Sequence, residues 1–220
     1  RKLKQTFETE VADRTPRDSF YHCLKNSAHQ FHNKQRDEHY ILAGYPWFKC
    51  RARDLFISLP GLTLAVEEQE EFEDVMKTAE KAIRQFVNGQ PLTYKIYEME
   101  HPDVLLWAVW ALQQYAKETS RERCRQMYGA LLEEIMNYIL GRKHSNLFLH
   151  ENGLLYTNGA EKAVTWMNST VNGKPVTPRT GYIVEVNALW YNALRFTADM
   201  LREGGNTLLA DNLDARAEKT

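Results

Sequence analysis

The chain has 220 residues, 43% of them hydrophobic and 26% charged, and a formal net charge of -1. This composition predicts a soluble globular protein, and the small net charge gives no support for a nucleic-acid partner or an anionic membrane. No apolar run is long enough to cross a bilayer, so we expect no membrane partner. The spacing of the three cysteines does not suggest a disulfide framework, which favours a cytoplasmic location.

The N-terminal part of the sequence predicts a polar extension, two helices and a loop between them. Residues 1–14 are polar and predict an N-terminal extension, whereas Thr15 and Pro16 predict the start of a first helix. A loop is expected at residues 35–39. A short apolar helix then follows from Asp54 to about residue 66, and Pro60 disturbs it.

Amphipathic helices alternate with helices that are apolar on all sides. Residues 67–88 carry one apolar stripe and predict a helix buried on one face. Residues 104–112 are apolar all round, which is typical of a helix buried on every side. Ser120 begins another amphipathic helix, and Gly141 ends it.

The periodicity is absent from residues 142 to 181, and a loop of this length inside a compact chain is usually functional. A largely apolar helix follows over residues 184–203, and a last amphipathic segment contains Leu208. The alternation predicts an all-α fold with inner and outer layers of helices in residues 15–220. The alternative is an irregular helical bundle.

Polar side chains coincide with aromatic rings where the apolar helices begin. Arg53 and Asp54 begin one helix, and Asp103 directly precedes another that contains Trp107 and Trp110. Each has a structural interpretation: the first two as a buried ion pair, Asp103 as a helix cap and the tryptophans as core. The repetition at several helix starts favours a pocket instead.

A third apolar helix begins with Glu185 and continues into Trp190, while Trp166, Asn168 and Arg179 lie in the long loop. In a ring of helices, the N-terminal ends of the inner helices would bring these residues together at one rim. Carboxylates, amides and guanidinium groups bind hydroxyl groups, and aromatic faces cover apolar ring surfaces. This combination predicts a sugar-binding pocket.

The sequence contains no comparable motif for a metal-binding or phosphate-binding site. The histidines His22, His29 and His32 have no carboxylate at matching spacing, and we interpret them as surface residues. The sequence contains no glycine-rich phosphate loop and no nucleophile elbow. We therefore expect no metal and no cofactor.

Three segments carry a specific resemblance, at residues 43–64, 103–115 and 165–194. They resemble the C-terminal glucosidase part of bacterial and archaeal glycogen debranching enzymes, the amylo-α-1,6-glucosidase family. The resemblance extends from about residue 18 to residue 201. The resemblance implies an (α/α)6 toroid and hydrolysis of α-1,6-glucosidic branch points in glycogen-like glucans. It also implies inversion at the anomeric carbon, with two carboxyl groups facing each other across the pocket.

The resemblance also implies site residues. Arg53 and Asp54 match the family's Arg-Asp pair, which looks like the clamp for the terminal glucose. Asp103 matches another sugar contact, and Glu185 matches the acid of the last apolar helix. With Trp47 from the aromatic run before Arg53 included, six residues are expected to bind substrate: Trp47, Arg53, Asp54, Asp103, Trp166 and Arg179.

The sequence departs from the family pattern in two ways. Asn168 stands where the pattern has the aspartate expected to donate the proton, and an amide cannot replace a carboxylic acid there. Glu185 is then the best remaining candidate for the catalytic acid. The predicted helices are also too few to close a six-pair ring, so we expect a partial toroid, from a fragment or a degenerate relative.

Three alternatives follow for function. The preferred hypothesis is a debranching-type glucosidase whose isolated chain is weakly active. The second is a glucan-binding or scaffold protein that has lost hydrolysis, which Asn168 favours. The third is a trehalase-like or other glucoside hydrolase. An open edge of apolar helices would also promote self-association.

Overall fold

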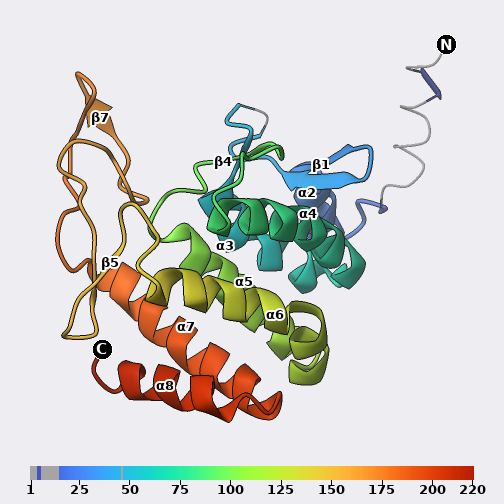
Figure 1. Cartoon of the computed structure of the whole chain (residues 1–220). Coiled ribbons are helices and arrows are strands. Elements are labelled where there is room, and N and C mark those ends of the chain that lie inside the picture. Colours follow the sequence, from blue (N-terminus) through green and yellow to red (C-terminus); the bar gives the residue numbers. More distant parts are fainter. Residues whose placement is uncertain (1–3, 6–14, 46) are drawn as a thin grey trace.

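The computed structural model describes residues 4–5, 15–45 and 47–220 (Figure 1). Most of the predicted extension over residues 1–14 lies outside this part. The described helices and strands, with the single 3-10 helix η1 (Leu64–Val66), have these bounds: α2 (Phe20–His29), α3 (Ala52–Leu62), α4 (Gln69–Val87), α5 (Val104–Glu118), α6 (Arg121–Leu140), α7 (Val184–Glu203), α8 (Thr207–Ala217), β1 (His32–Gln35), β2 (Glu38–Ile41), β3 (Cys50–Arg51), β4 (Ile96–Tyr97), β5 (Phe148–Leu149), β6 (Leu155–Tyr156), β7 (Thr170–Val171) and β8 (Lys174–Pro175).

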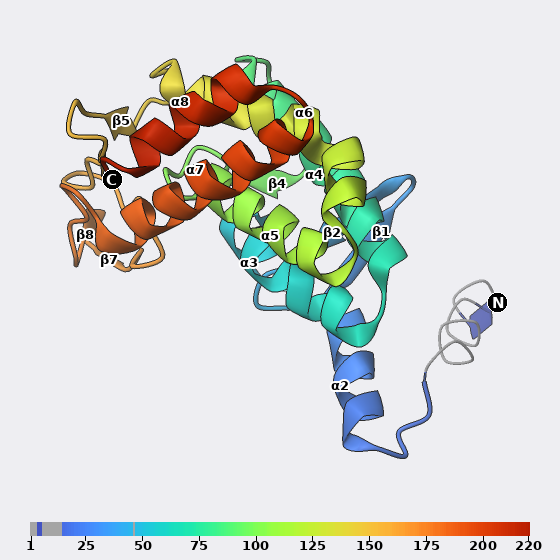
Figure 2. The same cartoon turned by 90° about the horizontal axis from the view of Figure 1, so that it is seen from below.

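The helices pack in two layers. Helix α5 lies between α3 and α7, and it contacts both (Figure 2). Helices α4 and α6 pack against each other on the outside of this row, and α8 packs along α7. In the part of the chain that the structure describes, α3 and α7 are separated by α5, so the row is an arc and not a closed ring (Figure 2). The predominance of helices agrees with the predicted fold class, and the short strands β1 to β8 are an addition to the predicted all-α fold.

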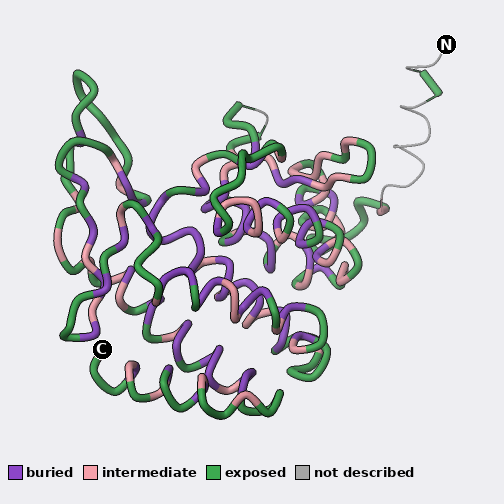
Figure 3. Tube along the Cα trace, in the orientation of Figure 1, coloured by how far each residue is buried: buried purple, intermediate pink, exposed green. Residues whose placement is uncertain are grey.

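The core follows the predicted hydrophobic patterns. On α4 one stripe is buried, and on α5 almost every residue of the first three turns is buried. Figure 3 shows this burial in the middle of the molecule and exposure at the tips of the outer loops. The cap at Ser120 is also present, because its side chain accepts a hydrogen bond from the backbone N–H of Arg123 at 3.1 Å.

The first predicted helix boundary and the following loop are wrong. Helix α2 begins at Phe20, since the side chain of Ser19 caps it by accepting from the backbone N–H of His22. Strands β1 and β2 then form an antiparallel hairpin where a loop was expected. Pro60 lies in the last turn of α3 and does not interrupt it. These positions lack a strong local signal, so packing decides them.

The long loop between α6 and α7 contains the β5–β6 and β7–β8 hairpins and is otherwise irregular. Reciprocal backbone hydrogen bonds between Thr157 and Gly181 join the segment after β6 to the end of the loop. At Gly159 a Cβ atom would lie 2.7 Å from the backbone nitrogen and oxygen of Arg179, so only glycine allows this close approach. The glycine therefore fixes where Arg179 emerges from the loop.

None of the helices in the described ranges combines the length and the apolar character needed to span a membrane.

Replacement of Leu106 by alanine tests the core on α5. Leu106 is fully buried, so Leu106→Ala should lower the free energy of unfolding by about 2–5 kcal/mol through lost transfer energy and a new cavity. Leu208 on α8 is 85% exposed, and Leu208→Ala should change the free energy of unfolding by less than about 0.5 kcal/mol. Urea denaturation measures both, and equal effects would contradict the burial of α5.

His144 makes stability depend on pH. Its ring is buried against Phe86 and Tyr138, and burial lowers the pKa of His144 to about 4. An unfolded histidine titrates near pH 6.5, so in this window the unfolded state binds a proton that the folded state does not. The free energy of unfolding should therefore fall as the pH is lowered from about 6.5 to 4.

The variant His144→Gln should reduce the slope of stability against pH in that window. Burial and the neighbouring Arg53 also lower the pKa of His101, which accounts for part of the remaining slope. Denaturation curves at a series of pH values provide the measurement. An unchanged slope in the variant would show that His144 is not the group that titrates.

Candidate active site

Arg53, in the first turn of α3, is buried and forms a bidentate ion pair with Asp103. Its Nε and Nη2 atoms donate to the two carboxylate oxygens of Asp103 at 2.7 and 2.9 Å. Nη2 also lies 2.9 Å from Nδ1 of His101 and donates to the backbone oxygen of Val164 at 3.2 Å. One side chain thus connects the start of α3, the start of α5 and the long loop.

The chemistry of this cluster requires a neutral His101. Burial, followed by the charge of Arg53, lowers the pKa of His101, so the ring is uncharged and Nδ1 can accept a hydrogen bond from the guanidinium. Sequence reasoning missed this residue. The available signal was its position two residues before Asp103, ahead of the most buried helix.

Asp103 has a different role from the helix cap considered from sequence. It occupies the N-cap position of α5, but its side chain accepts no hydrogen bond from the amides of that helix. It accepts instead from Arg53 and, at 3.3 Å, from Nε1 of Trp107. Since Asp103 is only 1% exposed, this pair is internal to the protein.

Asp54 is the exposed neighbour of the buried pair. Arg53 bonds to Asp103, so the interpretation of Arg53 and Asp54 as an ion pair is wrong. The carboxylate of Asp54 is exposed in the first turn of α3, and it makes no hydrogen bond or ion pair with the residues that the structure describes. It is therefore available to a ligand hydroxyl group.

A second cluster joins the long loop to the start of α7. Oε1 of Glu185 accepts a hydrogen bond from Nε1 of Trp166 at 3.2 Å and forms a close ion pair with Arg179. Nη1 of Arg179 also contacts the sulfur of Met167 at 3.3 Å. The ring of Trp166 remains 59% exposed, so it can still cover a bound molecule. Three residues predicted for the site are thus in contact.

The two clusters are linked through the backbone of residues 164–166. Val164 binds Arg53 through its carbonyl oxygen, and two residues later Trp166 binds Glu185. Asn168 follows on an exposed turn, where its backbone N–H donates to the oxygen of Trp166 at 3.0 Å. The segment 164–166 of the long loop therefore contacts Arg53 at the start of α3 and Glu185 at the start of α7.

Trp47 lies apart from both clusters. It is 77% exposed and lines an open hollow of about 350 Å³ together with Phe48, Lys49, Arg51, Tyr97 and Glu98. Arg51 pairs with Glu98 at 3.3 Å, two residues before Arg53. The hollow is thus adjacent in the chain to the first cluster, but the structure shows no contact that joins Trp47 to Trp166.

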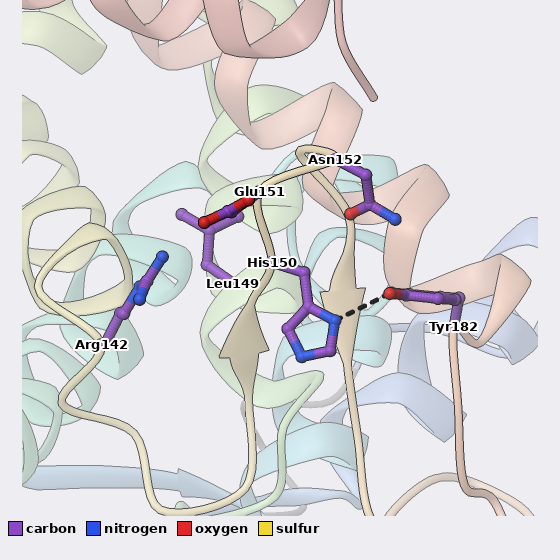
Figure 4. A pocket seen from close by; sticks show the side chains of 6 residues that line it. All are labelled: Arg142, Leu149, His150, Glu151, Asn152 and Tyr182. Carbon is purple, nitrogen blue, oxygen red and sulfur yellow. Dashed lines mark hydrogen bonds between the residues drawn. The ribbon is translucent and has the colours of Figure 1, made fainter.

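Another open hollow, of about 420 Å³, lies at the β5–β6 hairpin (Figure 4). Its side chains include His150, whose Nδ1 is 2.7 Å from the hydroxyl of Tyr182. The hollow contains none of the residues predicted for the site. We place the candidate site at the starts of α3, α5 and α7, because the two clusters formed by the predicted residues lie at these helix starts.

Comparison with known families identifies the family of the chain. The model of the amylo-alpha-1,6-glucosidase family matches residues 24–212. The chain belongs to this family. The match includes both clusters, and it confirms the resemblance to the C-terminal domain of glycogen debranching enzymes. No curated protein and no solved structure matches the chain.

Substitutions of Asp103 and Asp54 distinguish a structural role from a ligand-binding role. Asp103→Asn should lower the free energy of unfolding by about 3–5 kcal/mol, because Arg53 would keep a buried charge without its partner. Asp54→Asn should change stability by less than about 0.5 kcal/mol, since its side chain is exposed. Chemical denaturation of both variants is the measurement. A larger loss for Asp54→Asn would contradict the pairing described here.

Proposed function

We propose that this protein is a glycoside hydrolase that cleaves α-1,6-glucosidic branch points in glycogen-like glucans by an inverting acid/base mechanism. Membership of the amylo-alpha-1,6-glucosidase family supports the reaction class. The observation that carries the proposal is the contact of Glu185 with Trp166 and Arg179, linked through the long loop to Arg53 and Asp103.

Each residue of the candidate site receives a role from its surroundings. Trp166 offers an exposed ring to cover a sugar, and Asp54 offers an exposed carboxylate that can accept hydrogen bonds from glucose hydroxyl groups. Arg53 and Asp103 are buried, so we propose that they position the pocket floor. Trp47 is proposed as a contact for more distant parts of the glucan.

Glu185 is the proposed proton donor. Its side chain is 29% exposed, so a glycosidic oxygen can approach it. In the structure Oε1 accepts from Trp166 and Arg179, so donation requires the proton on Oε2 or a movement of Arg179. An inverting reaction also needs a carboxylate base at about 6.5–9.5 Å from the acid, which we propose lies on the opposite wall of the pocket.

We also propose that α3 to α8, the main helices of the domain predicted over residues 15–220, form an arc of an (α/α)6 toroid. The alternation of inner helices α3, α5 and α7 with outer helices supports this arrangement. Further helices would be needed to close the ring and to form the opposite wall.

A second candidate function is glucan binding without hydrolysis. Two observations favour it: Asn168 is an amide at the position of the expected acid, and Arg179 holds Glu185 in an ion pair. Such a protein would keep the ring of Trp166 and the carboxylate of Asp54 for binding, and it would lack an acid able to protonate the leaving oxygen.

The decisive experiment measures glucose release from a branched limit dextrin by the natural gene product. Glu185→Gln should lower the rate at least about 100-fold, because general acid catalysis contributes about 10²–10⁴-fold. The same variant should retain activity on aryl glucosides with good leaving groups, which need little protonation. Glu151→Gln, at the exposed hollow of Figure 4, is the matched control and should be neutral.

Asn168→Asp separates the two candidate functions. It should change hydrolysis little if Glu185 is the donor. A rise of several orders of magnitude would instead identify Asn168 as a disabled acid and support the binding function. Binding is measured separately, by retardation of the protein in a gel containing glycogen, so that lost binding and lost chemistry remain distinguishable.

A further inference from the structure

A histidine and carboxylate cluster lies away from the candidate active site, where the β1–β2 hairpin packs on α4. The register of the hairpin pairs Lys34 with His39. Because side chains alternate along a strand, His32, Lys34 and His39 lie on the same face of the hairpin. Contacts between β2 and α4 place this face against the helix. Glu71 and Asp74, three residues apart, supply the carboxylates from one side of α4.

The distances in this cluster are short and similar. Nδ1 of His39 lies 3.2 Å from Oε1 of Glu71 and 3.6 Å from Oδ2 of Asp74. The three ligand atoms all lie within 4.8 Å of one another. Nδ1 of His32 approaches the same Oε1 atom of Glu71, also at 3.2 Å. Four potential ligand side chains thus converge from two strands and one helix.

The separations of Nδ1 of His39 from the two carboxylate oxygens, 3.2 and 3.6 Å, fit a tetrahedral zinc site. Zinc binds histidine nitrogen and carboxylate oxygen at about 2.0–2.2 Å, so neighbouring ligand atoms lie about 3.3–3.6 Å apart. Two carboxylates and two imidazole rings offer the oxygen and nitrogen ligands that zinc binds. Lys34 bonds to Oε2 of Glu71 at 2.8 Å, which leaves Oε1 facing the histidines.

We propose that His39, Glu71 and Asp74 bind a zinc ion through Nδ1, Oε1 and Oδ2, with water completing the coordination and His32 next to Glu71. The site is accessible, because the side chain of Asp74 is 51% exposed, while those of His39 and Glu71 are only 14% exposed. Zinc there would fasten the β1–β2 hairpin to α4. This proposal is independent of the proposed glycosidase activity.

The test is titration of chelator-treated protein with zinc chloride in a calorimeter. Wild-type protein should bind one equivalent saturably, and Asp74→Asn and His39→Gln should each weaken binding at least about 10-fold, as expected for lost ligands. At a free zinc concentration 100-fold above Kd, the Tm should rise by about 5–10 °C. Cobalt should give the visible absorption of a tetrahedral complex, and His39→Gln should abolish it.

The matched control is another histidine and carboxylate pair, His22 with Asp18 on the N-terminal side of α2. His22→Gln should leave zinc affinity and the cobalt spectrum unchanged. Asp74→Asn changes a half-exposed side chain, so it keeps the fold even if His39→Gln does not. Absence of saturable binding to wild type, or equal binding by the Asp74→Asn variant, would overturn the proposal and leave the cluster as a hydrogen-bond network around Glu71.

Discussion

The buried ion pair between Arg53 and Asp103 is the constraint on which the rest of the candidate site depends. A guanidinium group inside a protein is tolerated only when its donors are satisfied. Here they are satisfied by a carboxylate at the start of α5, by neutral His101 and by the carbonyl oxygen of Val164. The pair therefore fixes the relative position of two inner helices, and it holds one point of the long loop against them.

The contact at Val164 positions the side chains of the long loop that lie next to Glu185. Trp166 follows Val164 closely, and its indole N–H reaches Glu185 at the start of α7. On the other side, Gly159 allows the chain to pass next to Arg179, whose guanidinium binds the same carboxylate. Glu185 is thus surrounded by groups from the loop and not from its own helix. The chain belongs to the amylo-alpha-1,6-glucosidase family. The proton-donating role that we propose for Glu185 depends on Trp166 and Arg179, which the loop supplies.

The histidine and carboxylate cluster at α4 lies away from the candidate active site. Its members are held by the β1–β2 hairpin and one turn of α4. The hairpin lies directly before the stretch that leads into α3. Fastening it to α4 would support the start of that stretch from outside the candidate site.

The sequence by itself determined the helices, their buried faces and the family, because these depend on local periodicity, capping residues and short motifs. The stripe on α4 and the cap at Ser120 are examples. It did not reveal the β1–β2 hairpin, whose turn places Arg36 at a positive φ of 58° without the usual glycine. Only the tertiary structure decided that Arg53 pairs with Asp103, fifty residues away, and not with the adjacent Asp54. The physical reason is that side-chain pairing follows the distances between packed elements, and separation along the chain does not encode those distances.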